Sequence, residues 1–298
     1  MHSDHSDDRR RPVLAIDLGG TKTLVALVCG ETIQDEITVP TARDDGPDRW
    51  LDAIGKAAGQ LSGTFAAVGI AVTGFVRNGC WSAMNPQTLG IPQDYPLVER
   101  MSALFQRPVT AINDAQAAAW GEFCFGAGEG EDLVFLTVST GVGGGIVANG
   151  RLMSGLAGHF GLVSKSPEDP QFFENEVSGR WMFAEAARQG HVADAREIFL
   201  LADAGQPWAQ GIIAASASRM ARLCNNIQLM LDPPTIVLGG GIGLAKGYRE
   251  RVQINMVALG ASPAVKLVPA RLGAKAGILG VGDLAARDQQ PALPRISW

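Results

Sequence analysis

Two stretches of the chain share one pattern, in which an apolar run is followed by a glycine-rich turn and a second apolar run. The first is AIDLGGTKTLVALV, residues 15–28, and the second is LVFLTVSTGVGGGIVANG, residues 133–150. Apolar runs interrupted in this way are typical of two strands joined by a turn. Because the pattern recurs, we predict an α/β protein with two related halves, each beginning with such a hairpin, and a ligand cleft between them.

The composition limits the class of protein. The 298 residues are 46% hydrophobic and 18% charged, which suits one large or two moderate folded domains. The net charge of −5 provides no basic field for nucleic acid or for an anionic membrane surface. Residues 1–12 are polar and resemble neither a signal peptide nor a membrane span, so we expect a cytoplasmic protein. The cysteines at 29, 80, 124 and 224 lack the spacing of a metal or redox site.

The order of the remaining patterns agrees with an α/β arrangement. After the first hairpin we expect a third strand, a helix, two strands and a second helix before the second hairpin. A helical region, a strand ending in a third glycine turn, a last strand and a closing helix follow it. These segments are residues 31–40, 48–63, 66–74, 107–114, 115–123, 174–231, 233–243, 264–272 and 274–288.

Three glycine clusters end or follow predicted strands: DLGGTK, STGVGGG and LGGGIG. Backbone N–H groups in such turns can converge on an anionic oxygen because no Cβ blocks the approach. A single cluster would more often be only a tight turn, but three clusters in two related halves favour a polyphosphate ligand. None has the spacing of a P-loop or of a Rossmann dinucleotide site.

Three groups of polar residues are candidates for chemistry. Asp17 stands where the first strand meets its turn, so it can face Mg²⁺ on bound phosphates, or it can bond its own backbone. Asp114 follows Asn113 at the end of a strand, where a carboxylate can accept a proton from a hydroxyl nucleophile or can cap the next helix. His159 and Glu174 have small or apolar neighbours, and either can be a packing or surface residue.

Taken together, these motifs resemble the ROK family of sugar kinases, in the superfamily of hexokinase and actin. The resemblance rests on motifs that occur in the family's order: AIDLGGTK, VTG, NPQTLG, INDAQAAAWGEF, VSTGVGGGI, GLAGHFG, EVSGR and VLGGGIGLAKGY. It implies two ribonuclease-H-like domains. The N-terminal domain is expected at residues 13–113 with the helix of residues 275–298, the larger C-terminal domain at 114–274, and a disordered tail at 1–12.

The resemblance also implies roles for matching residues. Asp114 is the expected general base for the sugar 6-hydroxyl, and Asp17 is expected to face Mg²⁺ without binding it directly. The residues expected to bind the sugar are Gly74, Asn85, Asn113, His159 and Glu174. The residues expected to bind ATP are Asp17, Gly19, Gly20, Thr21, Lys22, Thr140, Gly141, Val142, Gly143, Gly144, Gly239, Gly240 and Gly241.

One family feature is missing from the sequence. Members commonly hold a structural zinc ion through a histidine three residues after the position of His159 and through a following cysteine cluster. Leu162 occupies that histidine position, and the segment LVSKSPEDPQFFENE contains no cysteine. We therefore expect no zinc site, and we expect Phe160, Phe172 and Phe173 to hold this loop instead.

The activity implied by the resemblance is ATP-dependent phosphorylation of N-acetyl-D-mannosamine at its 6-hydroxyl, in sialic acid catabolism, by a homodimer. N-acetylglucosamine or glucose are alternative substrates within the family. A sugar-responsive repressor is a different possibility, but the dozen polar residues before the first strand are too few for a helix-turn-helix module. A sugar sensor without activity is a third possibility, although the expected base and glycine motifs are all present.

Overall fold

The structure is a computed structural model and describes residues 11–84, 89–164, 172–260 and 265–289. The chain divides into two compact units. Unit 1 comprises Met1–Gly121, Ser154–Leu156 and Ala274–Trp298, and unit 2 comprises Glu122–Met153 and Ala157–Gly273. No helix in the described part of the chain is both long and apolar enough to span a membrane.

Unit 1 is built on a five-stranded sheet in the order β3-β2-β1-β4-β7. The strands are β1 (Val13–Leu18), β2 (Lys22–Cys29), β3 (Thr32–Pro40), β4 (Ala67–Val72) and β7 (Val109–Asn113). The first three form an antiparallel meander, whereas β4 and β7 run parallel to β1. A small hairpin of β5 (Phe75–Arg77) and β6 (Cys80–Ser82) follows β4.

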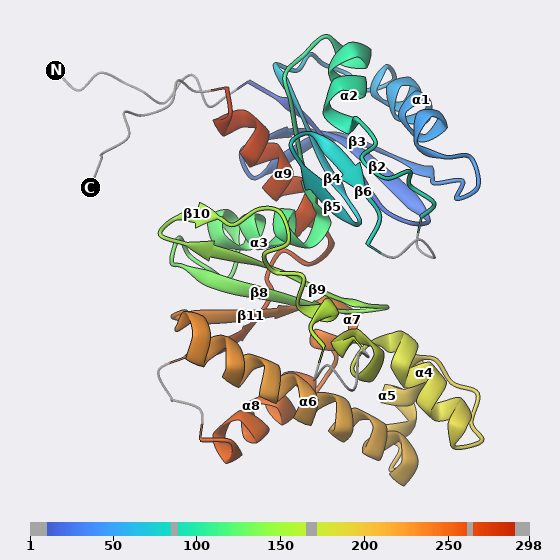
Figure 1. The fold of residues 1–298 in the computed structure, drawn as a ribbon, viewed down its shortest axis with the longest axis vertical. Coiled ribbons are helices and arrows are strands. Elements are labelled where there is room, and N and C mark those ends of the chain that lie inside the picture. Colours follow the sequence, from blue (N-terminus) through green and yellow to red (C-terminus); the bar gives the residue numbers. More distant parts are fainter. Residues whose placement is uncertain (1–10, 85–88, 165–171, 261–264, 290–298) are drawn as a thin grey trace, which may run out of the picture. The chain divides into compact units, whose positions relative to one another are not determined.

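Helices cover both faces of the first sheet (Figure 1). The helices α1 (Pro47–Ala58) and α2 (Leu97–Phe105) pack on one face, and α9 (Ala276–Arg287) packs against β1 and β4 on the other. Because strand side chains alternate between faces, Leu14, Ile16 and Leu18 lie in the core under α1 and α2. Asp17 therefore lies on the α9 face, at the end of β1.

Unit 2 repeats the topology with a sheet in the order β10-β9-β8-β11-β12. Its strands are β8 (Leu133–Val138), β9 (Val142–Ala148), β10 (Arg151–Leu152), β11 (Thr235–Gly239) and β12 (Lys266–Pro269). The pair β8 and β9 is the antiparallel hairpin, and β11 and β12 are parallel to β8. Both sheets thus place a hairpin beside two parallel strands, which confirms the predicted α/β class with two related halves.

The helices of unit 2 gather on one side of its sheet (Figure 1). They are α4 (Gly179–Arg188), α5 (Ala195–Asp203), α6 (Pro207–Leu231) and α8 (Tyr248–Ala258), with the short α7 (Gly240–Gly243) directly after β11. The single turns η2 (Phe160–Leu162) and η3 (Phe173–Glu176) lie between β10 and α4, and η4 (Gly273–Lys275) precedes α9. The long α6 carries much of the core of this unit, including Ile213, Met220 and Ile227.

Two local predictions are wrong. Asp17 belongs to β1 and not to the turn, because it pairs with Leu24 of β2. The predicted strand of residues 233–243 does not end in a glycine turn, since Gly240 begins the short helix α7 directly after β11. The physical reason is that β11 has a parallel neighbour on each side, so the chain must leave the sheet through a crossover.

Candidate functional site

The first glycine turn places Asp17 beside the start of α9. The Gly19 N–H donates to the Lys22 carbonyl (3.1 Å), which closes the turn between β1 and β2. On the far side of Asp17, a Cβ on Gly277 in the first turn of α9 would lie 3.6 Å from Asp17 Oδ2 and 3.8 Å from the Asp114 carbonyl oxygen. The N-terminal end of α9 therefore lies against both acidic residues, where a helix N-terminus favours negative charge.

The two acidic residues of unit 1 both have raised pKa values. Burial and, to a smaller extent, the neighbouring Asp114 raise the pKa of Asp17 to about 6, although Lys22 acts in the opposite direction. Burial also raises the pKa of Asp114, while the Ala115 N–H and the Asn113 side chain lower it. Unit 1 thus holds two carboxyl groups within electrostatic range of each other.

Asn113, and not Asp114, caps helix α3 (Asp114–Phe125). The Asn113 Oδ1 atom accepts hydrogen bonds from the N–H groups of Ala115 (3.0 Å) and Gln116 (3.1 Å). The Asn113 side-chain amide donates to the Gly74 carbonyl (2.7 Å), which ties the end of β7 to the segment after β4. Asn113 therefore holds the N-cap position, and Asp114 is the first residue of the helix, with its Oδ1 atom accepting from the Ala115 N–H (2.8 Å).

The second glycine turn, in unit 2, rests on the N-terminus of α4. The Ser139 N–H donates to the Gly141 carbonyl (2.9 Å) and makes the turn tight. The N–H groups of Gly179 and Arg180 then donate to the carbonyls of Ser139 (2.7 Å) and Thr140 (3.4 Å). The first backbone donors of α4 are thus used to hold the turn.

A cavity of about 920 Å³ opens next to this turn in unit 2. Thr140 and Gly241 contribute to its wall, so the second and third glycine clusters each supply a residue to one cavity. The other lining residues come from the turn after β8, from α4, from α5 with its N-cap, and from α7 and the segment after it: Ser139, Gly179, Arg180, Phe183, Asp194, Ala195, Arg196, Phe199, Leu200, Asp203, Ile242, Ala245 and Lys246. Nothing in the sequence marked the cations Arg180, Arg196 and Lys246 or the rings of Phe183 and Phe199 as cavity residues; Lys246 lies in the segment after α7 and the others lie on α4 and α5.

The cavity has the properties of a site for a nucleotide. Its volume lies in the range of small-molecule and cofactor sites. Phe183 and Leu200 supply apolar surface, whereas Arg180 and Arg196 supply positive charge near the glycine turn. Apolar surface suits the base of a nucleotide, and cations together with convergent backbone N–H groups suit its phosphates.

Glu174 lies against the second glycine turn. Its Oε1 atom accepts from the Arg180 guanidinium (2.9 Å), and its Oε2 atom accepts from the Val142 N–H (3.4 Å). His159 immediately precedes η2 and is half-buried. Glu174 thus has protein partners in the second glycine turn and in α4. The predicted sugar-binding residue Asn85 lies outside the described residues.

The residues of this chain do not fit the zinc site of the family. Leu162 has no ligand atom in its side chain, and the sequence has no cysteine between Cys124 and Cys224. The described residues contain no group of three or more histidine, cysteine or acidic side chains that could hold a metal ion. A β-bridge between Ser164 and Phe172 joins the two ends of the loop. Phe160 and Phe173 pack against the core of unit 2, whereas Phe172 is exposed.

Comparison with known proteins identifies relatives over most of the chain. The bifunctional enzyme NanE/NanK of Brucella melitensis is 46% identical over 282 residues, which are 92% of this chain and 54% of the relative. The chain thus spans about half the length of that relative. The N-acetylmannosamine kinase of Shigella flexneri is 40% identical over 284 residues, which are 92% of this chain and 98% of the relative.

Solved structures with the same fold include sugar kinases. A ROK hexokinase from Thermus thermophilus matches with a TM-score of 0.83 and 30% identity, over 93% of this chain and 98% of the other. A ROK family glucokinase from Streptomyces griseus, in complex with glucose and AMPPNP, matches with a TM-score of 0.78 and 26% identity, over 93% and 99%. Both agree with the actin and hexokinase type of fold that the two related sheets indicate. Residues 13–288 match the model of the ROK family, and the chain therefore belongs to the ROK family.

Proposed function

We propose that this protein is an ATP-dependent kinase that phosphorylates N-acetyl-D-mannosamine at the 6-hydroxyl group. The observation that carries the proposal is the arrangement in unit 1, where Asp114 stands at the first position of α3 with a raised pKa and with Asp17 nearby. The choice of sugar is supported by relatives named N-acetylmannosamine kinase, of which one is covered over 98% of its length.

Asp114 is the proposed general base. A base works best when its pKa lies close to the working pH, and burial moves the pKa of this carboxyl group upward from its usual value. In phosphoryl transfer to an alcohol, a carboxylate accepts the proton of the hydroxyl group as its oxygen attacks the γ-phosphorus. Asn113 is the N-cap of α3, so the Asp114 side chain is not needed as the cap, although its Oδ1 atom accepts from the Ala115 N–H (2.8 Å).

The cavity of unit 2 is the proposed site for ATP. Thr140 of the second glycine turn and Gly241 of the short helix α7 line this cavity, and Arg180 and Arg196 supply positive charge. A related glucokinase was solved with AMPPNP, an analogue of ATP, which supports the same phosphoryl donor for this chain. In unit 1, residues 19–22 are proposed as a further phosphate-binding segment.

Mg²⁺ fits the surroundings of Asp17. Burial and the neighbouring Asp114 disfavour the charged form of the Asp17 carboxylate and raise its pKa, and a bound cation would favour that charged form. Magnesium typically uses one or two carboxylates together with phosphate oxygens and retains several waters. When bound, the ion offsets charge on the phosphates, and Asp17 is proposed to hold it through water.

The proposed sugar contacts are Gly74, Asn85, Asn113, His159 and Glu174. Asn113 already donates one hydrogen bond to the Gly74 carbonyl, which holds the two residues next to each other. The remaining N–H of the Asn113 amide is proposed to contact a sugar hydroxyl group.

A homodimer is proposed as the assembled form, in the cytoplasm. Several large apolar side chains on α6 and α8 are exposed in the isolated chain, among them Leu229 (79%), Met230 (69%), Ile254 (69%) and Val257 (66%). Both helices belong to unit 2 and pack against each other. Exposed apolar groups of this kind support an interface with a second copy.

The test is ATP turnover by the purified protein with Mg²⁺ and, in parallel, N-acetylmannosamine, N-acetylglucosamine, glucose or mannose. We expect the highest kcat/KM with N-acetylmannosamine. The variant Asp114→Asn should lose at least about 100-fold in kcat, the scale of a general base, and still bind ADP. Preference for another sugar would refute the substrate, and no turnover with any sugar would refute the kinase.

A further inference from the structure

The side chain of Arg180 joins two parts of unit 2 that the proposed function uses separately. Arg180 is the second residue of α4 and lines the cavity proposed for ATP. Its Nη2 atom donates to Glu174 Oε1 at 2.9 Å, and Glu174 is a proposed sugar contact. The exposed fraction is 42% for the Arg180 side chain and 13% for the Glu174 side chain, so the carboxylate is the more enclosed partner.

The Glu174 carboxylate is pressed against the second glycine turn. A Cβ on Gly141 would lie 2.8 Å from Glu174 Oε2, so a larger residue at position 141 would push the carboxylate away from the turn. The same oxygen accepts from the Val142 N–H at 3.4 Å, which is the long end of the hydrogen-bond range. The short contact with Arg180 is therefore the stronger of these two interactions.

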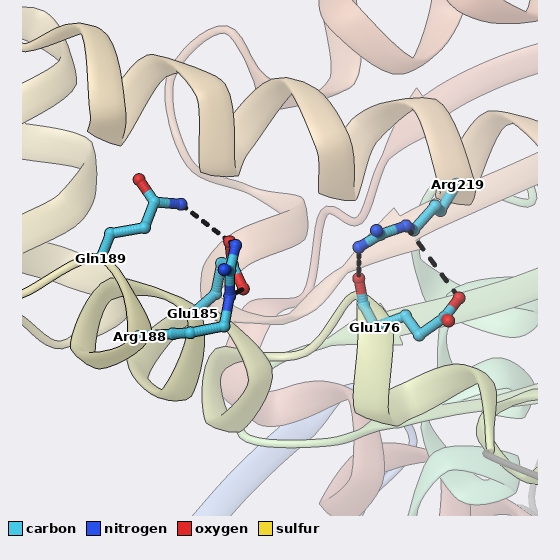
Figure 2. A network of polar contacts seen from close by, with 5 residues as sticks. All are labelled: Glu176, Glu185, Arg188, Gln189 and Arg219. Atoms are coloured by element: carbon cyan, nitrogen blue, oxygen red, sulfur yellow. Dashed lines mark hydrogen bonds and ion pairs between the residues drawn. The ribbon is translucent and has the colours of Figure 1, made fainter.

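The backbone around this pair is anchored independently. Arg219 of α6 donates to the Glu176 carbonyl (2.7 Å), approaches its carboxylate (4.0 Å), and lies 4.7 Å above the Trp181 ring. Figure 2 shows Arg219 reaching from α6 to Glu176. Because Arg219 holds η3 and the start of α4 together, loss of the Arg180 side chain should leave the segment folded and change only the position of Glu174.

We propose that Arg180 is a positioning residue, whose guanidinium group holds the Glu174 carboxylate against the turn of residues 139–142. It thereby fixes the positions of the proposed sugar contact Glu174 and of the turn beside the cavity proposed for ATP. Its effect on the sugar rests on the proposed function, whereas its effect on the turn does not. Without Arg180, an enclosed carboxylate keeps one long hydrogen bond, and it must move toward water or displace the turn.

The helix α4 offers a matched control. Arg188 stands at the far end of the same helix and pairs with Glu185 (2.6 Å), and its side chain is 72% exposed (Figure 2). Arg188→Ala removes an arginine and an ion pair from α4 without touching the turn or the cavity. A general effect of shortening an arginine on this helix would appear in both variants.

The experiment compares Arg180→Ala, Arg180→Lys, Glu174→Gln and the double variant Arg180→Ala/Glu174→Gln with Arg188→Ala. The readouts are kcat, the KM for each substrate, and hydrogen exchange at the amides of residues 139–142. We expect Arg180→Ala to raise the sugar KM at least tenfold at saturating ATP and Arg180→Lys to restore part of it. The double variant should be no worse than the poorer single variant, since both changes break one unit.

The outcomes separate this proposal from the kinase assignment. A sugar KM within twofold of the wild type in Arg180→Ala, with only the ATP KM raised, would overturn the positioning role and leave a direct phosphate contact. Additive losses in the double variant would overturn it as well. If the wild type phosphorylates no sugar, the proposed function fails, and the positioning role of Arg180 is then tested by hydrogen exchange alone. Faster exchange at residues 139–142 in Arg180→Ala than in Arg188→Ala supports the positioning role, and equal exchange refutes it.

Discussion

Replacing Asp17 with asparagine should stabilise the folded protein at neutral and alkaline pH. Asp17 lies at the end of β1 beside α9, where burial and Asp114 raise the pKa of its carboxyl group from 3.8 to about 6. The charged form is therefore less favourable in the folded state than in the unfolded state. Asparagine has nearly the same shape and carries no charge, so the variant avoids this cost.

The pKa values give the magnitude and the sign. A shift of about two pKa units, at about 1.36 kcal/mol for each unit, corresponds to about 3 kcal/mol at pH 8. Between about pH 4 and pH 6 the folded state binds more protons at Asp17 than the unfolded state does. The free energy of unfolding of the wild type therefore falls as the pH rises through this window, and the contribution of Asp17 is constant above it. The advantage of Asp17→Asn should be near zero at pH 4 and up to about 3 kcal/mol at pH 8.

The assay is urea unfolding of both proteins without nucleotide at pH 4, 5, 6, 7 and 8, followed by circular dichroism. Asp52 on the exposed side of α1 provides the control, and Asp52→Asn should change stability by less than about 0.5 kcal/mol at each pH. A difference between Asp17→Asn and the wild type that does not grow with pH would refute the reasoning. So would a variant less stable than the wild type at pH 8. The same variant should lose turnover, because a carboxylate whose charged form costs stability in the folded protein is retained for its function.

Two further predictions concern packing. Glu122→Ala should lower the free energy of unfolding by about 3–5 kcal/mol in urea, because the buried Glu122 carboxylate accepts from the N–H groups of Ala127, Arg271 and Leu272. A cost close to that of the exposed control Glu131→Ala would contradict this. Gly280→Ala in α9 should cost at least about 1–3 kcal/mol, since its Cβ would overlap the Ala117 carbonyl oxygen of α3. As a control, Gly211→Ala in α6 should stabilise the protein by about 0.5–1 kcal/mol, because a Cβ there would meet no other atom within 4 Å. Both glycine variants are compared with the wild type by thermal unfolding, and equal effects of the two changes would refute the close contact at Gly280.

The repeated hairpins could be predicted because the information is local. Glycines that interrupt apolar runs mark the turn, and the apolar runs mark the strands. The helix α7 could not be predicted in the same way, because Gly240 follows a strand whose parallel neighbours, β8 and β12, are distant in sequence. Local glycine content does not reveal whether the next strand returns beside the last one.

The candidate site was predictable only as a set of residue types. The sequence left Asp114 open between a helix cap and a base, and the side-chain bonds of Asn113 decide against the cap. The pair of Glu174 and Arg180 joins a single helical turn to the start of a helix, and no spacing rule indicates it. The cavity residues Arg196 and Lys246 come together only through the packing of α5 and the segment after α7.

The central claim is tested most directly by identifying the product that the wild-type protein makes from ATP, Mg²⁺ and N-acetylmannosamine. A two-dimensional proton and phosphorus NMR spectrum reports which sugar hydroxyl group carries the phosphate. The account predicts a phosphate coupled to the C6 protons, and no such signal with Asp114→Asn under the same conditions. A phosphate on another hydroxyl group, the same product with Asp114→Asn, or no phosphorylated sugar would contradict it.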